Sequence, residues 1–148
     1  MRKVFGLTDG AQDKTYPALD KSLFETLLTP TRIYVKSILA LLKEVQPKGI
    51  CHITGGGFYE NIPRALPEGL CAKIKRSDVR VLPIFDIIAR EGNVPERDMF
   101  NTYNMGVGMT VTVDPADVEK ALEILRANGE DAYVLGEVVE GEKGVELW

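Results

Sequence analysis

Residues 51–64 read CHITGGGFYENIPR, and the interpretation of the whole chain starts from this stretch. The short apolar run at 49–53 is typical of a buried strand. A threonine and three consecutive glycines at 54–57 end that strand, and a short helix is predicted from residue 58 to about residue 65. The sequence therefore predicts a strand, a glycine-rich turn and a helix in direct succession.

Three glycines in a row carry a high entropic cost on folding, so we expect a backbone with positive φ or a close approach by another group. A strand end, a glycine turn and a helix start present several free N–H groups at one point, where the helix dipole adds partial positive charge. An anion is the natural ligand of such a place. A tight turn without any ligand has the same local pattern, so both interpretations stay open.

The composition is that of a globular protein. The chain has 148 residues, of which 45% are hydrophobic and 27% charged, which fits one domain with a sizeable core. The net charge of −4 argues against general binding to nucleic acid or to an anionic membrane surface. No apolar run is long enough to span a bilayer and no signal peptide is recognised, so we expect a cytoplasmic protein.

Cysteine and histidine are rare. Cys51 and Cys71 have no metal-ligand spacing and are expected to be reduced, buried thiols, and no metal site is predicted. The single histidine, His52, could bind a phosphate or move a proton if it faced a cleft. A lone histidine is more often a satisfied core residue, and that alternative is kept.

The remaining elements alternate between helix and strand. Thr29-Pro30 is a strong helix start, with an apolar face through Tyr34, Ile38, Leu41 and Val45 that Val35, Leu39 and Leu42 widen, ending near Gln46-Pro47. This pattern indicates an α/β or α+β fold with helices covering a mixed sheet of about four to five strands. The other predicted segments are the last turn of a helix at 2–5, a loop at 8–17, a helix at 19–28, strands at 70–74, 107–113, 132–139 and 145–148, and helices at 83–92 and 114–128.

Four further residues are candidates for anion or ligand binding. Arg32 lies near the predicted start of a helix, where a cation is unfavourable, so it is either offered to an anion or simply solvated. Asn61 and Arg64 lie one turn apart after the glycines and either reach a bound anion or form an ordinary helix end. Asn104 precedes a Gly-Val-Gly run and either binds a ligand amide or caps the turn.

Three separate motifs, in this order, resemble the phosphoribosylformylglycinamidine cyclo-ligase family, also called aminoimidazole ribonucleotide synthetases. They are LLTPTRIYVKS at 27–37, HITGGGFYENIPR at 52–64 followed by Leu66-Pro67, and YNMGVGM at 103–109. The resemblance implies the fold of the C-terminal domain of that superfamily. It also implies that the chain is a portion of that domain, and that the ATP-binding N-terminal domain lies outside it.

The resemblance implies an ATP- and Mg²⁺-dependent ligase of purine biosynthesis that activates a formyl oxygen and closes the imidazole ring. ATP and Mg²⁺ are expected mainly on the N-terminal domain, with none bound to this piece, and the full-length enzyme is expected to be a homodimer. Carried over by position, His52 is the candidate acid or base. The candidate substrate and phosphate ligands are Thr54, Gly55, Gly56, Gly57, Asn61, Arg64, Asn104 and Arg32.

Two alternatives remain. One is a free-standing module of the same fold that binds a phosphorylated ligand or a protein partner without catalysis. The other is a relative within the superfamily, such as formylglycinamide ribonucleotide amidotransferase or selenophosphate synthetase.

Overall fold

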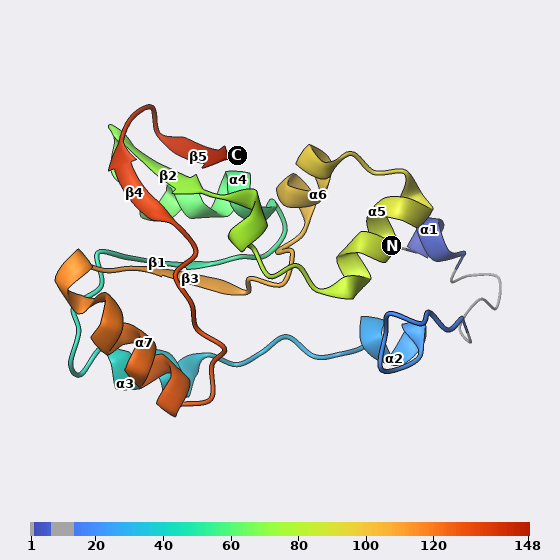
Figure 1. Ribbon diagram of the computed structural model, residues 1–148, viewed down its shortest axis with the longest axis horizontal. Helices are drawn as coiled ribbons and strands as arrows, with labels where there is room; N and C mark the ends of the chain where they lie inside the picture. Colours follow the sequence, from blue (N-terminus) through green and yellow to red (C-terminus); the bar gives the residue numbers. More distant parts are fainter. Residues whose placement is uncertain (1, 7–13) are drawn as a thin grey trace.

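The structure is a computed structural model that describes residues 2–6 and 14–148. The described part of the chain forms five strands arranged in two sheets, with helices packed against both (Figure 1). The loop predicted at 8–17 falls mostly outside the described residues. The α+β class with a mixed sheet is confirmed, although the strands are divided over two sheets instead of one.

The two-stranded sheet carries the glycine stretch. Strand β1 (Gly49–His52) pairs antiparallel with β3 (Met109–Thr112), and His52 lies opposite Met109. The predicted strand at 49–53 is therefore present as β1, but it is not buried throughout, because Ile50 and His52 are exposed while Cys51 and Ile53 are buried. Among the described residues no strand pairs with the other edge of β1.

The three-stranded sheet is mixed. Strand β2 (Leu70–Ile74) lies in the middle, antiparallel to β4 (Glu137–Glu140) and parallel to β5 (Gly144–Leu147). The strand predicted at 145–148 is confirmed by β5, which lies on the other side of β2 from β4. The long strand predicted at 132–139 is shorter than expected, since only its last three residues belong to β4.

The helices mostly follow their local start and stop signals. Ser22 and Glu25 form a capping box at the start of α2, Pro83 is the first residue of α5, and Asn93 ends α5 with a φ of 47°. The helices, with 3₁₀ helices labelled η, are α1 (Arg2–Phe5), α2 (Leu23–Leu27), α3 (Val35–Leu41), α4 (Gly57–Asn61), η2 (Ile62–Ala65), η3 (Arg76–Asp78), α5 (Pro83–Gly92), α6 (Glu96–Thr102), η4 (Pro115–Asp117) and α7 (Val118–Ala127).

The helix start predicted at Thr29-Pro30 is wrong. The hydroxyl of Thr29 donates to the carbonyl of Glu25 at 3.2 Å, so this residue completes the end of α2. Residues 30–34 have no regular secondary structure, and α3 begins only at Val35. The Tyr34 carbonyl accepts the Ile38 N–H at 3.0 Å, which fixes the start of the helix five residues later than predicted. The helix also ends earlier, at Leu41.

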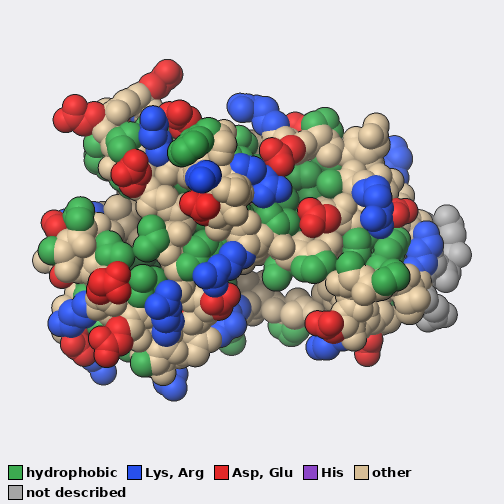
Figure 2. Space-filling view, viewed as in Figure 1, with side chains coloured by type: hydrophobic (Ala, Val, Ile, Leu, Met, Phe, Trp, Pro, Cys, Tyr) green, Lys and Arg blue, Asp and Glu red, His purple; other side chains and the backbone are tan. Residues whose placement is uncertain are grey.

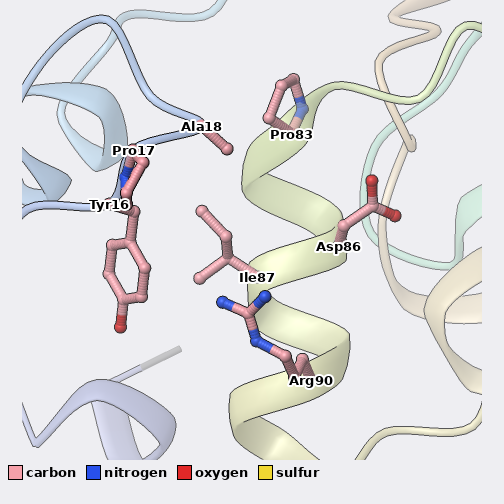
Figure 3. A pocket seen from close by; sticks show the side chains of 7 residues that line it. All are labelled: Tyr16, Pro17, Ala18, Pro83, Asp86, Ile87 and Arg90. Atoms are coloured by element: carbon pink, nitrogen blue, oxygen red, sulfur yellow. The ribbon is translucent and has the colours of Figure 1, made fainter.

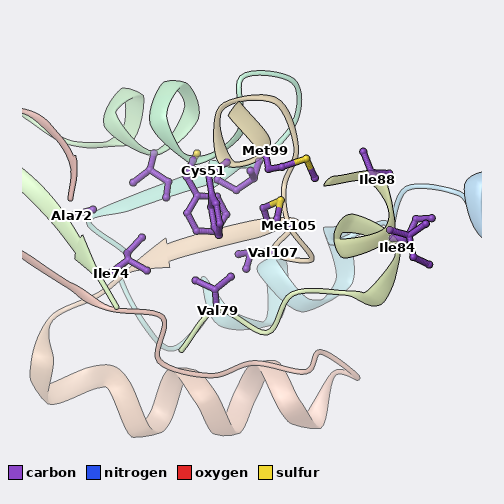
Figure 4. Close-up of a cluster of buried hydrophobic side chains, with 14 of the residues drawn as sticks. Cys51, Ala72, Ile74, Val79, Ile84, Ile88, Met99, Met105 and Val107 are labelled. Atoms are coloured by element: carbon purple, nitrogen blue, oxygen red, sulfur yellow. The ribbon is translucent and has the colours of Figure 1, made fainter. Parts of the chain in front are cut away.

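Two hydrophobic cores hold these layers together. The larger core lies where β1, α4, α5, α6 and the three-stranded sheet meet (Figure 4). Within it the rings of Phe58 and Phe100 pack edge to face, with their centroids 5.1 Å apart. The smaller core contains Leu41, Val45 and Ala121, where α3 and α7 pack side by side against β3 (Figure 1). The predicted apolar face is thus confirmed at Leu41, and Val45 is also buried although it lies beyond the end of α3.

The side chains expected to widen that face are exposed instead. Val35 is 61%, Leu39 56% and Leu42 49% exposed, and Ile33, just before the helix, is 81% exposed. Acidic and basic side chains are interspersed over the face of the molecule seen in Figure 2, with no large region of one sign. No helix among the described residues is both long and apolar enough to cross a membrane.

Candidate functional site

The glycine loop between β1 and α4 has the backbone that the sequence predicts. Gly56 has a φ of 96° and Gly57 a φ of 55°, both in the region that side-chain-bearing residues rarely adopt. Gly57 is also crowded, because a Cβ there would overlap the carbonyl oxygen of Phe100 and lie 2.9 Å from that of Tyr103. Gly55 has open space around it. Two of the three glycines are therefore required by the backbone.

Asn61 organises the carbonyls of this loop. Its side-chain Nδ2 donates to the carbonyl of Gly57 at 2.8 Å, to that of Gly55 at 3.1 Å and, more weakly, to that of Thr54 at 3.5 Å. The side chain is buried, with the whole residue only 4% exposed. Asn61 thus turns the loop carbonyls toward itself, a role that the sequence did not predict.

Some N–H groups of the loop donate hydrogen bonds within the protein and others do not. The Gly57 N–H donates to the Thr54 carbonyl at 3.1 Å and is already consumed. Within residues 2–6 and 14–148, the N–H groups of Gly55 and Gly56 meet no hydrogen-bond acceptor. Two adjacent donors therefore remain for a ligand, while the neighbouring carbonyls are occupied.

A cavity of about 300 Å³ adjoins the loop. Three consecutive residues of β1, Ile50 to His52, line it on one side. Helices α4 and η2 supply the opposite wall. Its lining residues are Ile50, Cys51, His52, Thr54, Asn61, Arg64 and Ala65.

His52 is not a core residue. Its side chain is exposed and lines the cavity, which rules out the buried alternative. The Tyr34 ring packs against the imidazole edge to face, with the ring centroids 5.9 Å apart and an interplanar angle of 71°. The neighbouring Cys51 is buried, and this desolvation raises the pKa of its thiol, an effect that a hydrogen bond with Thr110 and the charge of Arg64 partly offset.

Arg64 brings a positive charge to the cavity, and Glu60 places a negative charge next to Arg64. The Arg64 guanidinium is 3.8 Å from the Glu60 carboxylate, and both side chains are more than half exposed. That carboxylate also lies over Gly56, since a Cβ on this glycine would be 2.6 Å from Oε2. Glu60 was not predicted as a site residue, although its place four residues after Gly56 and four before Arg64 is the signal that could have found it.

Arg32 and Asn104 do not line the cavity. Arg32 forms an ion pair with Glu130 at 2.7 Å and also donates to the carbonyl of Gly129, just after α7. Asn104 accepts the N–H of Gly106 at 3.1 Å through its side-chain oxygen, which is the turn-capping alternative. The structure therefore gathers His52, Thr54, Asn61 and Arg64 around the cavity and places Arg32 and Asn104 outside it. The three glycines follow Thr54 directly in the chain but are not among the lining residues.

A second cavity of similar volume, about 300 Å³, lies between α5 and the segment before α2 (Figure 3). Ile87 and Tyr16 point into it, and Asp86 and Arg90 border it from α5. Desolvation raises the pKa of Tyr16, and the nearby Glu91 adds to this shift. This cavity has no glycine loop and was not predicted from the sequence. Its lining residues are Tyr16, Pro17, Ala18, Pro83, Asp86, Ile87 and Arg90.

Comparisons with known proteins agree with the resemblance. The family described as "AIR synthase related protein, C-terminal domain" matches residues 1–148. The chain is 49% identical over 148 residues to a phosphoribosylformylglycinamidine cyclo-ligase of Lachnospira eligens, covering 99% of this chain and 43% of that protein. It is 53% identical over 148 residues to the protein of the same name from Thermoanaerobacter sp., covering 99% of this chain and 44% of that protein.

The chain thus spans less than half the length of the curated relatives it matches. The family match, in contrast, extends over the entire sequence and includes all three motifs. The chain belongs to the family of AIR synthase related proteins, C-terminal domain.

Proposed function

We propose that this chain is the substrate-binding C-terminal domain of a phosphoribosylformylglycinamidine cyclo-ligase. The complete enzyme would use ATP to close the imidazole ring of aminoimidazole ribonucleotide from formylglycinamidine ribonucleotide. The names of the two relatives support this reaction. The single structural observation that carries the site is the cavity beside the glycine loop, with its two open amides and Arg64.

In this proposal the loop and Arg64 bind the substrate phosphate. The N–H groups of Gly55 and Gly56 donate to phosphate oxygens, and the Arg64 guanidinium leaves Glu60 to complete the contact. Thr54 lies exposed at the mouth of the same cavity and adds a hydroxyl donor. His52, on the β1 wall, holds or moves a proton on the part of the substrate that undergoes ring closure.

The described residues do not fit a magnesium site. No group of three or more His, Cys, Asp or Glu side chains comes together within residues 2–6 and 14–148. The proposal therefore assigns ATP and Mg²⁺ to the part of the enzyme that precedes this domain in the relatives. No step assigned to this chain depends on a metal.

The rest of the enzyme is also the proposed partner of this domain. The exposed apolar side chains Ile33, Val35 and Leu39 support such a contact, because apolar side chains gathered on one surface commonly mark an interface. We propose that the complete enzyme is a homodimer in the cytoplasm. Gel filtration of the complete enzyme tests the dimer, and a monomeric elution volume would contradict it.

Joining this chain to the N-terminal part of the Lachnospira relative tests the reaction directly. When formylglycinamidine ribonucleotide is present, the joined protein should hydrolyse ATP and form the imidazole product. The chain alone should do neither. The matched control is the same joined protein carrying Arg64→Ala. A folded joined protein that binds ribose 5-phosphate but makes no product would favour the non-catalytic binding module.

A further inference from the structure

The Tyr34 ring is the principal aromatic contact of His52 among the described residues. Its position is narrowly defined. The Tyr34 hydroxyl lies against the Cα of Gly108, so that any side chain at 108 would overlap it. The Gly108 carbonyl in turn accepts the N–H of Ile53, the residue next to His52, at 2.8 Å. Tyr34 is therefore wedged between β3 and the imidazole that faces the cavity.

A polar network fixes the backbone of Tyr34 from the other side. The Ser37 hydroxyl lies within hydrogen-bond distance of both the Tyr34 carbonyl, at 3.0 Å, and the Glu130 carboxylate, at 2.7 Å. Glu130 also pairs with Arg32 at 2.7 Å. Ser37 is 2% exposed and the Glu130 side chain 15% exposed, so the contacts of Ser37 are shielded from water, whereas the Arg32 side chain is 55% exposed.

We infer that Tyr34 is a positioning residue that holds the His52 imidazole toward the cavity, and that Arg32, Glu130 and Ser37 hold Tyr34 in place. Arg32 would then act on His52 through Glu130, Ser37 and Tyr34 instead of binding an anion itself. An exposed histidine on a strand has several accessible rotamers, and an aromatic neighbour fixed on both sides restricts them. The proton-transfer role of His52 rests on the proposed function, but its orientation by Tyr34 does not.

The orientation can be tested on the 148-residue chain by NMR, because His52 is its only histidine and its ring signals are unambiguous. Tyr34→Leu removes the ring current and should move the His52 ring signals toward those of an unpacked imidazole. Tyr34→Phe should leave them nearly unchanged. Gly108→Ala keeps the tyrosine but displaces it, and should move the signals in the same direction as Tyr34→Leu.

The network is tested by Glu130→Gln, which should cause a smaller displacement in that same direction. The control is Tyr16→Leu, which removes a tyrosine from the second cavity and should leave the His52 signals in place. Unchanged His52 signals in both folded Tyr34→Leu and folded Gly108→Ala proteins would overturn the inference.

The consequence for catalysis is measured in the joined protein described above. Tyr34→Leu should lower kcat about tenfold with little change in KM, whereas Tyr34→Phe should keep most of the kcat of the parent. Equal kcat values for Tyr34→Leu and the parent would limit Tyr34 to packing and overturn its positioning role. If the parent itself makes no product, the proposed function fails while the NMR experiment still decides the orientation.

Discussion

The side chain of Asn61 donates to the carbonyl of Gly57, four residues earlier, at 2.8 Å, and the same nitrogen reaches the carbonyl of Gly55 at 3.1 Å. One buried amide group thus supports both ends of the glycine loop. This explains how a loop with two open N–H groups is held without a ligand. The shape of the site is therefore set by a residue that has its donor group directed into the loop and not into the cavity.

Replacing Asn61 should destabilise the protein more than an average polar substitution. Asn61→Ala removes the donor shared by the carbonyls of Thr54, Gly55 and the buried Gly57, and is expected to lower the free energy of unfolding by about 2–3 kcal/mol. Urea denaturation measures this loss. Asn101→Ala is the control, because Asn101 is exposed and should change stability by less than about 0.5 kcal/mol. Equal small losses for both variants would show that the loop does not need Asn61.

The glycines of the loop should differ in their tolerance of a methyl group. Gly57→Ala combines a positive φ with overlap of the Phe100 carbonyl and is expected to cost about 3 kcal/mol or more. Gly55→Ala meets no atom within 4 Å and should be within about 0.5 kcal/mol of the parent. Thermal unfolding of the pair gives the comparison. A Gly57→Ala protein as stable as the Gly55→Ala protein would contradict the described loop.

The opposing charges at the cavity make a prediction about phosphate binding. Arg64→Ala should weaken the binding of ribose 5-phosphate several-fold, whereas Glu60→Gln should strengthen it by about twofold to fivefold at low salt, because a carboxylate near the loop repels the phosphate. Calorimetry measures both, with ribose as the uncharged reference ligand. Arg90→Ala removes a guanidinium that pairs with Glu91 at 3.6 Å beside the other cavity and should change nothing.

For the binding of ribose 5-phosphate, two results would count against the site. Loss of affinity in Arg90→Ala equal to that in Arg64→Ala would indicate a general charge effect. Weaker binding in Glu60→Gln would mean that Glu60 contacts the ligand favourably, for example through a sugar hydroxyl, and that Arg64 does not need to be released.

Cys51 should make stability depend on pH in the alkaline range. Burial raises the pKa of this thiol in the folded protein, so the unfolded chain loses its proton first as the pH rises. The contribution is fully present below the ordinary thiol pKa of about 8.5 and is lost as the pH rises through the raised folded value. Urea denaturation between about pH 8 and pH 10 should show a decline that Cys51→Ala reduces.

Cys71→Ala is the matched control for this pH dependence, because Cys71 is half-buried and should leave the alkaline decline in place. Cys51 should also react more slowly with iodoacetamide than Cys71, since alkylation needs an accessible thiolate. A faster reaction at Cys51 would show that the β1 wall opens readily.

Local patterns predicted those parts of the site that depend on neighbouring residues. The run of glycines correctly indicated positive φ. The apolar run at 49–53 and the strands predicted at 70–74 and 107–113 correctly placed β1, β2 and β3. Thr29-Pro30 misled because the same residues that cap a helix start can also complete the end of the preceding helix. The contacts of α2 decide whether Thr29 starts a new helix or ends the preceding one.

The contacts that bring distant segments together could not be derived from the sequence in this way. Tyr34, His52 and Gly108 meet although the first lies in the segment before α3, the second in β1 and the third just before β3. The position of Arg32 near a predicted helix start gives no hint of its partner Glu130, which lies almost a hundred residues later in the chain. No periodicity encodes such pairs, and only the packing of α3 and α7 against the sheet places them.

The smaller core has a consequence for the motions of the domain. Only Leu41, Val45 and Ala121 are fully buried between α3 and α7, so this layer is held by far less apolar contact than the rest of the described residues. Amide protons of α3 should therefore exchange with solvent through partial opening events, whereas those of β2 should exchange only through global unfolding. Each such event would carry Tyr34 away from β1 and leave the imidazole briefly without its aromatic neighbour.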